Sequence, residues 1–241
     1  MAETESAAQR FERWSKEAPS GEGDIPAATV ILLRDSDRGL ETLMLRRNSK
    51  LKFVGGMWVF PGGRVDPEDR AGLADDDVLG AARVAAVREA EEESALIVDP
   101  SGLIPFSHWT PPAISPRQFL TWFFVTRAPE GSVAIDDGEI HDHAWMRPGE
   151  ALARRDAQEI ELAPPTWVTL YELSQCADVE AALTLARGRT PEHYTTKIAE
   201  VEGGALGLWH GDAGYEDGDA DKPGPRHRLW MVKDGYRFER T

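Results

Sequence analysis

Short apolar runs separated by turn-forming residues recur along the first half of the chain and predict a sheet. Apolar residues at three- and four-residue spacing predict one helix, over residues 78–95. The third apolar run ends at Pro61-Gly62-Gly63, which predicts a tight turn. Runs of strand length, rich in β-branched and bulky side chains, cover residues 25–33, 43–47, 57–60, 103–109, 119–127 and 140–146.

The second half of the chain predicts helices first and strands afterwards. A mobile loop is expected over residues 211–224, which are acidic and rich in glycine. The predicted organisation is a flexible tail over residues 1–24, an α/β domain over residues 25–150, and an α+β extension over residues 151–241 that packs on this domain. Helices are predicted from Pro148 and over residues 166–175 and 178–187, and strands over residues 205–210 and 228–232.

Composition indicates a folded acidic protein and excludes some partners. With 241 residues, 41% of them hydrophobic, the chain can bury a sizeable core. Its net charge of −15 argues against non-specific binding to nucleic acid or anionic membranes, which depends on basic surfaces. No apolar run approaches the roughly 18 residues that cross a bilayer, and the N-terminus lacks the order of a signal peptide. With Cys176 as its single cysteine, a cytoplasmic protein is expected.

Three carboxylates on the predicted helix, Glu89, Glu92 and Glu93, indicate a metal site. A helix advances about 100° per residue, so they lie within about 100° of arc, with Cβ atoms about 5–6 Å apart. Like charges at this range repel by about 1 kcal/mol in water, and the last turns of a helix disfavour anions by roughly 0.3–1 kcal/mol each. A hard cation such as Mg²⁺ or Mn²⁺ would relieve both penalties. The alternative is a solvated acidic face.

Gly62 and Gly63 favour the metal interpretation. Glycines directly after a strand allow unusual backbone angles and close approach to a ligand or metal. An ordinary tight turn is the alternative. Because the protein is acidic, an anionic substrate would need metal ions to bridge it to the chain. The two segments together predict a divalent-metal site that handles a pyrophosphate.

These residues resemble the signature of the Nudix hydrolases, GX5EX7REUXEEXGU, where U is a bulky aliphatic residue. Asp69 stands at the first glutamate, and Ala95, expected to have ordinary helical angles or to end the helix mildly, replaces the late glycine. The spacer has 18 residues instead of seven, an insertion of 11 that a loop tolerates. The matching residues are Phe60-Pro61-Gly62-Gly63 before the signature and at its start, then Arg88-Glu89, Ala90, Glu92-Glu93 and Leu96.

The resemblance implies a Nudix α/β/α sandwich with a mixed β-sheet, and hydrolysis of a nucleoside diphosphate linked to another group. Glu89, Glu92 and Glu93 would hold Mg²⁺ or Mn²⁺ with help from a carbonyl of Gly62 or Gly63. Arg88 would orient Glu89 or Glu92. The general base would be Glu89 or Glu92, or an acid from a later loop, for which Glu139 is the candidate. The predicted phosphate contacts are Arg46, Arg47, Arg117 and Gly62, although each arginine alone is more typical of an ordinary surface residue.

A finer resemblance concerns the branch that includes the mammalian peroxisomal coenzyme A diphosphatases. It rests on the insertion, on Thr110-Pro111 and on Pro116-Arg117-Gln118-Phe119, and it implies coenzyme A or acyl-coenzyme A as substrate. The alternatives are ADP-ribose, NADH or a nucleotide sugar, or a non-catalytic Nudix protein that binds a ligand. A homodimer is one assembly that the family resemblance implies.

Overall fold

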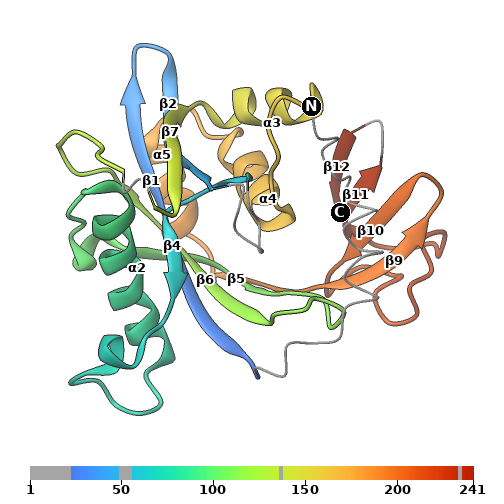
Figure 1. Ribbon diagram of the computed structural model, residues 1–241. Coiled ribbons are helices and arrows are strands. Elements are labelled where there is room, and N and C mark those ends of the chain that lie inside the picture. Colours follow the sequence, from blue (N-terminus) through green and yellow to red (C-terminus); the bar gives the residue numbers. More distant parts are fainter. Residues whose placement is uncertain (1–22, 49–55, 136–137, 233–234) are drawn as a thin grey trace. The chain divides into compact units, whose positions relative to one another are not determined.

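The apolar runs of the first half form strands of a mixed sheet (Figure 1). The computed structural model describes residues 23–48, 56–135, 138–232 and 235–241, so the predicted tail lies almost wholly outside it. The sheet order is β3-β2-β1-β6-β5-β8, with β4 paired to β1 and β7 paired to β2. The strands are β1 (Ile25–Ser36), β2 (Gly39–Arg47), β3 (Trp58–Val59), β4 (Gly62–Arg64), β5 (Ile104–Thr110), β6 (Phe119–Arg127), β7 (Ile140–Met146) and β8 (Glu192–Thr195).

Both strand directions occur in this sheet. β2 and β4 are antiparallel to β1, and β3 and β7 are antiparallel to β2. The Ile25 N–H donates to the Gln118 carbonyl at 2.8 Å, and the Ala128 N–H donates to the Leu33 carbonyl at 2.7 Å. Because these contacts advance in the same order along both strands, β1 and β6 are parallel. The mixed sheet implied by the sequence is therefore confirmed.

Helices cover the sheet. α2 (Val78–Ser94) buries Ala86 and Ala90 in one core cluster with Leu43 and Leu45 of β2. Three further helices follow β7, and of these α3 packs against α4 and contacts β2. This arrangement confirms the predicted α/β sandwich (Figure 1). The three helices are α3 (Pro148–Asp156), α4 (Pro164–Leu173) and α5 (Val179–Arg187).

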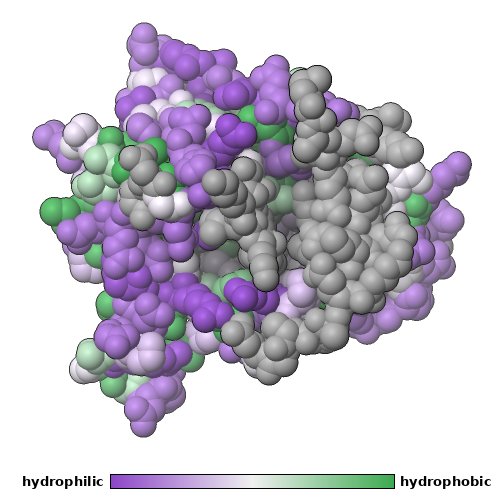
Figure 2. Space-filling view, viewed as in Figure 1, coloured by the Kyte–Doolittle hydropathy of each residue, from purple (hydrophilic) through white to green (hydrophobic). Residues whose placement is uncertain are grey.

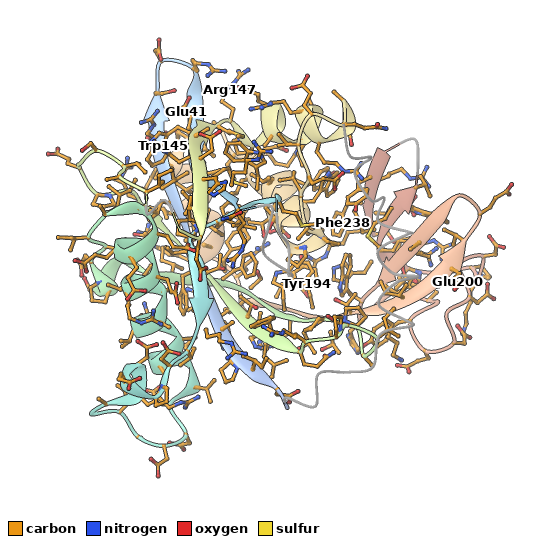
Figure 3. All side chains as sticks on the ribbon, in the orientation of Figure 1. Glu41, Trp145, Arg147, Tyr194, Glu200 and Phe238 are labelled. Carbon is orange, nitrogen blue, oxygen red and sulfur yellow. The ribbon has the colours of Figure 1, made fainter. Side chains whose placement is uncertain are left out.

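An ion-pair group fixes the hairpin of β1 and β2. The Glu41 side chain is 4% exposed, and its Oε2 accepts from Nε and Nη2 of Arg34 at 2.9 and 2.7 Å. The Arg34 guanidinium lies 4.2 Å from the centre of the Trp145 ring on β7. Figure 3 labels Glu41 and Trp145 near this end of the sheet. The hairpin is thereby held to β7 as well as paired within itself.

The two ends of α2 have different caps. Asp77 caps the start, since its Oδ1 accepts from the Gly80 N–H at 2.8 Å. The helix ends at Ala95 with φ 57° and ψ 19°, a left-handed conformation. This conformation costs about 1–2 kcal/mol for a residue with a Cβ and is usually taken by glycine. Ala95 does end the helix, which was one of the two expectations, but the other, ordinary helical angles, was wrong, because its φ is positive.

We expect Ala95→Gly to raise the free energy of unfolding by about 0.5–1 kcal/mol, because relief of strain exceeds the entropy that glycine adds to the unfolded chain. Urea denaturation would measure the change. Ala157→Gly is the matched control, since Ala157 ends α3 with φ −73° and has no strain to relieve. An equal gain in both variants would contradict left-handed strain as the cause.

The described chain divides into two compact units. The larger unit comprises Pro26–His108 and Thr121–Glu192, and the smaller unit comprises the described residues of Met1–Ile25, Trp109–Leu120 and His193–Thr241. The predicted boundary at residue 150 does not coincide with a boundary between the units, because residues 151–192 group with α2 and the main sheet.

The smaller unit contains a sheet in the order β12-β11-β10-β9. A core of aromatic rings includes Trp209, which packs against Tyr194 and Phe238 with ring centres 5.1 and 6.0 Å away. Figure 3 labels Tyr194 and Phe238. The predicted loop over residues 211–224 holds Asp212, which forms a fully buried ion pair with Arg228 at 2.6 Å. The strands are β9 (Lys197–Val201), β10 (Gly204–Leu208), β11 (His227–Val232) and β12 (Gly235–Arg240), of which β9 and β12 were not predicted.

The visible surface is mostly hydrophilic, and its apolar residues are scattered (Figure 2). Large hydrophobic side chains are exposed at separate places, for example Val84 on α2 and Leu185 on α5. Within the ranges that the structure describes, no helix has the length and apolar character needed to cross a membrane.

Candidate functional site

Gly62 and Gly63 lie in a strand, not in the predicted turn. They begin β4, which pairs with β1 and lies beside α2 (Figure 1). Neither glycine has a positive φ. A Cβ on Gly62 would overlap the backbone of β1 at Thr29, and a Cβ on Gly63 would overlap the carboxylate of Glu89. The glycines are therefore needed for close packing against β1 and α2.

Glu93 is the most buried of the three glutamates. It is 6% exposed, and its Oε2 accepts from the Gly62 N–H at 2.9 Å. Burial is the main cause that raises the pKa of Glu93 to about 8, and repulsion from Glu89 adds to it. The Gly62 hydrogen bond and the attraction of Arg47 act in the opposite direction. Without further positive charge nearby, this carboxyl keeps its proton at neutral pH.

Glu89 lies between solvent and the protein interior. Its side chain is 15% exposed, and the adjacent Gly63 leaves the space that its carboxylate fills. Burial, with repulsion from Glu92, raises the pKa of Glu89. The hydrogen bond and the attraction from Arg88 offset part of that rise. Additional positive charge would therefore stabilise the charged forms of both Glu89 and Glu93.

Arg88 joins three carboxylates. Its Nη1 donates to Glu89 Oε1 at 2.9 Å and to Glu92 Oε2 at 3.0 Å. Its Nε and Nη2 donate to the two carboxylate oxygens of Asp69 at 3.1 and 2.9 Å, and Nη2 also donates to the Arg64 carbonyl at 3.0 Å. The hydrogen bond to Asp69 is the main cause that raises the pKa of Arg88. The structure thus brings Arg88 to both glutamates that it was predicted to orient.

Asp69 anchors Arg88, a function that its place in the signature did not predict. It lies in a short 3-10 helix, η1 (Pro67–Arg70), and is 3% exposed. Burial by itself would raise the pKa of Asp69, but the hydrogen bonds from Arg88 and the Asp66 N–H hold that pKa below its usual range. The sequence signal for this residue was an acidic side chain at the position of the first glutamate of the Nudix signature.

The glutamates fit a hard cation by chemistry, although their side chains are not gathered around one point. In the part of the chain that the structure describes, no three His, Cys, Asp or Glu side chains form a group that could hold a metal ion. Arg88 lies between Glu89 and Glu92, and Glu93 faces the Gly62 N–H. A divalent cation prefers oxygen donors and would supply the positive charge that Glu93 lacks.

The predicted phosphate contacts lie in different places. Arg47 ends β2, and its Nη2 lies 3.2 Å from Glu139 Oε2. Arg46 is exposed on the same strand. Arg117 belongs to the smaller unit, so the geometry around the glutamates does not test its predicted contact with phosphate. The Gly62 N–H is bonded to Glu93, so a contact of Gly62 with substrate would use another atom.

Comparisons with known proteins identify relatives of this chain. A Caenorhabditis elegans protein named "Putative nudix hydrolase 7" is 30% identical over 188 residues, which cover 63% of this chain and 61% of the worm protein. The chain therefore spans less than two thirds of that relative. The crystal structure of a NUDIX hydrolase from Alicyclobacillus acidocaldarius has a TM-score of 0.62 at 23% identity, and the match covers 68% of this chain and 97% of that chain.

A family model shows the same relationship. The model of the NUDIX domain matches residues 24–166, more than half of the chain. Hydrolases of this family generally use divalent metal ions. The match includes the glycines of β4 and the glutamates of α2. The chain therefore belongs to the Nudix hydrolase family.

Proposed function

We propose that this protein hydrolyses a pyrophosphate bond in a nucleoside diphosphate derivative, with Mg²⁺ or Mn²⁺ as cofactor. The observation that carries the proposal is the buried Glu93, held by Gly62 beside two glutamates that share Arg88. A solvated acidic helix face would leave all three carboxylates in water. With Glu93 only 6% exposed, that alternative does not account for the site.

Glu89, Glu92 and Glu93 would hold the metal ions, with the Gly63 carbonyl as a further donor. Bound divalent ions would neutralise charge on the phosphate oxygens and lower the pKa of the attacking water. If Glu89 and Glu92 turned to a metal ion, Arg88 would lose hydrogen bonds, because its Nη1 donates to one oxygen of each glutamate. Its two hydrogen bonds to Asp69 would still keep the guanidinium in place.

The chain's own groups also supply candidates for proton transfer and phosphate binding. Glu89 and Glu92 adjoin Arg88, which fixes their direction, and either would accept a proton from water. Glu139, whose carboxylate accepts a hydrogen bond from Arg47 at the end of β2, is a third candidate base. Arg46 and Arg117 are proposed contacts for the anionic part of the substrate.

Coenzyme A or acyl-coenzyme A is our leading substrate. The support is the insertion before Arg88 and the Pro116-Arg117-Gln118-Phe119 segment, which are similar to the coenzyme A diphosphatase branch. ADP-ribose, NADH and nucleotide sugars keep the same chemistry and differ in the group attached to the diphosphate. A non-catalytic ligand-binding protein is the alternative from another class, and Ala95 in place of glycine is the feature that favours it.

A substrate panel tests the proposal. The protein would be incubated with coenzyme A, ADP-ribose, NADH and nucleotide sugars in the presence of Mg²⁺ or Mn²⁺, and products would be identified by mass. Release of 3′,5′-ADP and a phosphopantetheine supports coenzyme A, whereas AMP and ribose 5-phosphate support ADP-ribose. Glu92→Gln is the control, since it removes a proposed metal ligand at an exposed position. Equal inactivity of both proteins on every substrate would favour the binding protein.

The two glycines of β4 allow a matched prediction. Gly63→Ala places a methyl group against the Glu89 carboxylate, so we expect kcat/KM to fall about 10–100-fold with little change in stability. Gly62→Ala places a methyl group against the backbone of β1, which moves less easily than a side chain. We therefore expect the free energy of unfolding to fall by about 1–3 kcal/mol. Hydrolysis rates and urea denaturation of both variants would separate the effects. Full activity in Gly63→Ala would contradict the importance of the Glu89 position.

A further inference from the structure

The segment that follows β6 lies against the C-terminal end of α2. We name this segment, residues 128–135, the strap, and Figure 1 shows it in yellow-green beside the end of the helix. The Ala134 N–H donates to the Ser94 carbonyl at 3.0 Å. Ser94 is the last residue of α2, and a carbonyl at this position has no partner within its own helix. The strap therefore completes the hydrogen bonding of the helix end.

Apolar contacts attach the strap to the same end of α2. Val133 and Ile135 pack against the core cluster that contains Ala90 and Leu96. Leu96 follows the helix by two residues and is 2% exposed. A Cβ on Gly131, whose φ is 147°, would lie 3.3 Å from Leu96 Cδ2, closer than ordinary van der Waals contact. The strap is thus packed into the core on both sides of the last helical turn.

The beginning of the strap is anchored to the main sheet. The Ala128 N–H donates to the Leu33 carbonyl at 2.7 Å, where the parallel pair of β1 and β6 ends. The strap is therefore hydrogen-bonded to the sheet near one end and to α2 near the other. Because both attachments are to regular elements, the strap limits how far the last turn of α2 can move from the sheet.

The last turn of α2 carries two of the proposed metal ligands. Glu92 and Glu93 directly precede Ser94, in the part of a helix that disfavours negative charge. Glu93 accepts from the Gly62 N–H, whereas the Glu92 side chain is 58% exposed. Helix ends open locally at a lower free energy than helix centres do. Such opening would displace both carboxylates, and the attachments of the strap oppose it.

We propose that the strap is a positioning segment, which keeps the last turn of α2 closed and thereby holds Glu92 and Glu93 in place at the metal site. The inference rests on the proposed function. The strap acts through its backbone and its apolar side chains, and not as a ligand. Groups that orient metal ligands change metal affinity about 10–100-fold when they are removed. Val133 and Gly131 are the positioning residues that substitution can test.

A role in general core packing predicts a different result. Leu79, in the first turn of α2, packs against the same core cluster as Val133. If the strap only contributes to stability, truncation at either end of α2 should have the same effect on metal affinity. If the strap positions the last turn, only truncation at the strap should weaken metal binding. The location of the lost contact, and not the size of the stability loss, then determines the affinity.

Mn²⁺ binding to the full chain, followed by the electron paramagnetic resonance signal of free Mn²⁺, tests the inference together with urea denaturation. We expect Val133→Ala to weaken binding about 10-fold. Gly131→Ala should also weaken it, because alanine is strained at this φ and its methyl group presses on Leu96. Leu79→Ala should lose more stability than Val133→Ala and bind as wild type does. Gly203→Ala, at a φ of 78° with open space around it, controls for backbone strain.

Amide hydrogen exchange of the metal-free protein provides a second readout. We expect faster exchange in the last turn of α2 in Val133→Ala, because local opening becomes easier there. In Leu79→Ala the first turn should exchange faster, and the last turn should exchange as in wild type. Unchanged exchange of the last turn in Val133→Ala would overturn the inference.

The binding data separate this inference from the proposed function. If wild type binds Mn²⁺ and Val133→Ala binds it equally well, the proposed function stands and the positioning role is wrong. Equal weakening in Val133→Ala and Leu79→Ala would also overturn the positioning role, because core packing in general would then set the affinity. Absence of Mn²⁺ binding in wild type would overturn the proposed function and this inference with it.

Discussion

Arg88→Ala is expected to lower the free energy of unfolding by about 2–4 kcal/mol and kcat/KM by about 10³-fold. The stability loss follows because Asp69, only 3% exposed, would remain buried without its guanidinium partner. The activity loss follows because Glu89 and Glu92 would lose the donor that sets their directions. Urea denaturation and hydrolysis of the best substrate would measure the two effects.

A second substitution separates the stability effect of Arg88 from its effect on activity. Asp69→Asn in the Arg88→Ala background removes the buried charge that has lost its partner. Part of the free energy of unfolding should therefore return while activity stays low. Arg83→Ala is the control on the same helix, because Arg83 donates to the Pro100 carbonyl at 3.1 Å and has no proposed part in the reaction. If Arg88→Ala kept wild-type activity, Arg88 would not orient the glutamates.

The metal-free protein is expected to lose stability as the pH rises, and Glu93 is expected to cause most of that loss. The folded state holds the pKa of Glu93 at about 8, above the ordinary carboxyl range that applies after unfolding. The stability from this group is therefore complete below the ordinary range and is lost as the pH rises through about 8. The pKa of Glu93 is raised from 4.5 to about 8 in the folded state. One pKa unit corresponds to about 1.4 kcal/mol, so the loss amounts to about 5 kcal/mol.

Glu93→Gln and added metal test this explanation. The amide does not titrate, so unfolding between pH 5 and pH 9 should show a much flatter stability curve in the variant, at roughly constant ionic strength. Mg²⁺ or Mn²⁺ should restore stability to wild type at high pH and leave Glu93→Gln unchanged, because metal binding replaces the proton. Hydrolysis by Glu93→Gln should fall about 10³-fold. A wild-type curve as flat as that of the variant would show that Glu93 titrates normally.

Most of the fold could be predicted because its elements carry a local pattern. β6 and β7 have the predicted bounds, and α2 ends one residue before the predicted end. The short strands β4 and β8 were not predicted, because their formation depends on a partner. β4 exists because Gly62 and Gly63 fit against β1 and α2, although two glycines after a proline are typical of a turn. β8 has four residues and belongs to an edge of the main sheet.

The candidate site could be predicted where residues are near in sequence. Helical spacing placed Glu89, Glu92 and Glu93 together, but it could not show that their exposure differs so widely. That difference arises from β4, which covers Glu93 and leaves Glu92 in solvent. The contacts of Arg88 with Asp69 and of Arg47 with Glu139 join segments 19 and 92 residues apart, a separation at which no sequence periodicity operates.

A crystal structure of the protein grown with Mn²⁺ tests the central claim most directly. Data collected at the manganese absorption edge identify the ion by its anomalous signal. The account predicts anomalous density among the carboxylates of Glu89, Glu92 and Glu93, with those side chains turned from Arg88 and Gly62 toward the ion. Fully bound Mn²⁺ elsewhere, with these three carboxylates keeping their present partners, would contradict it.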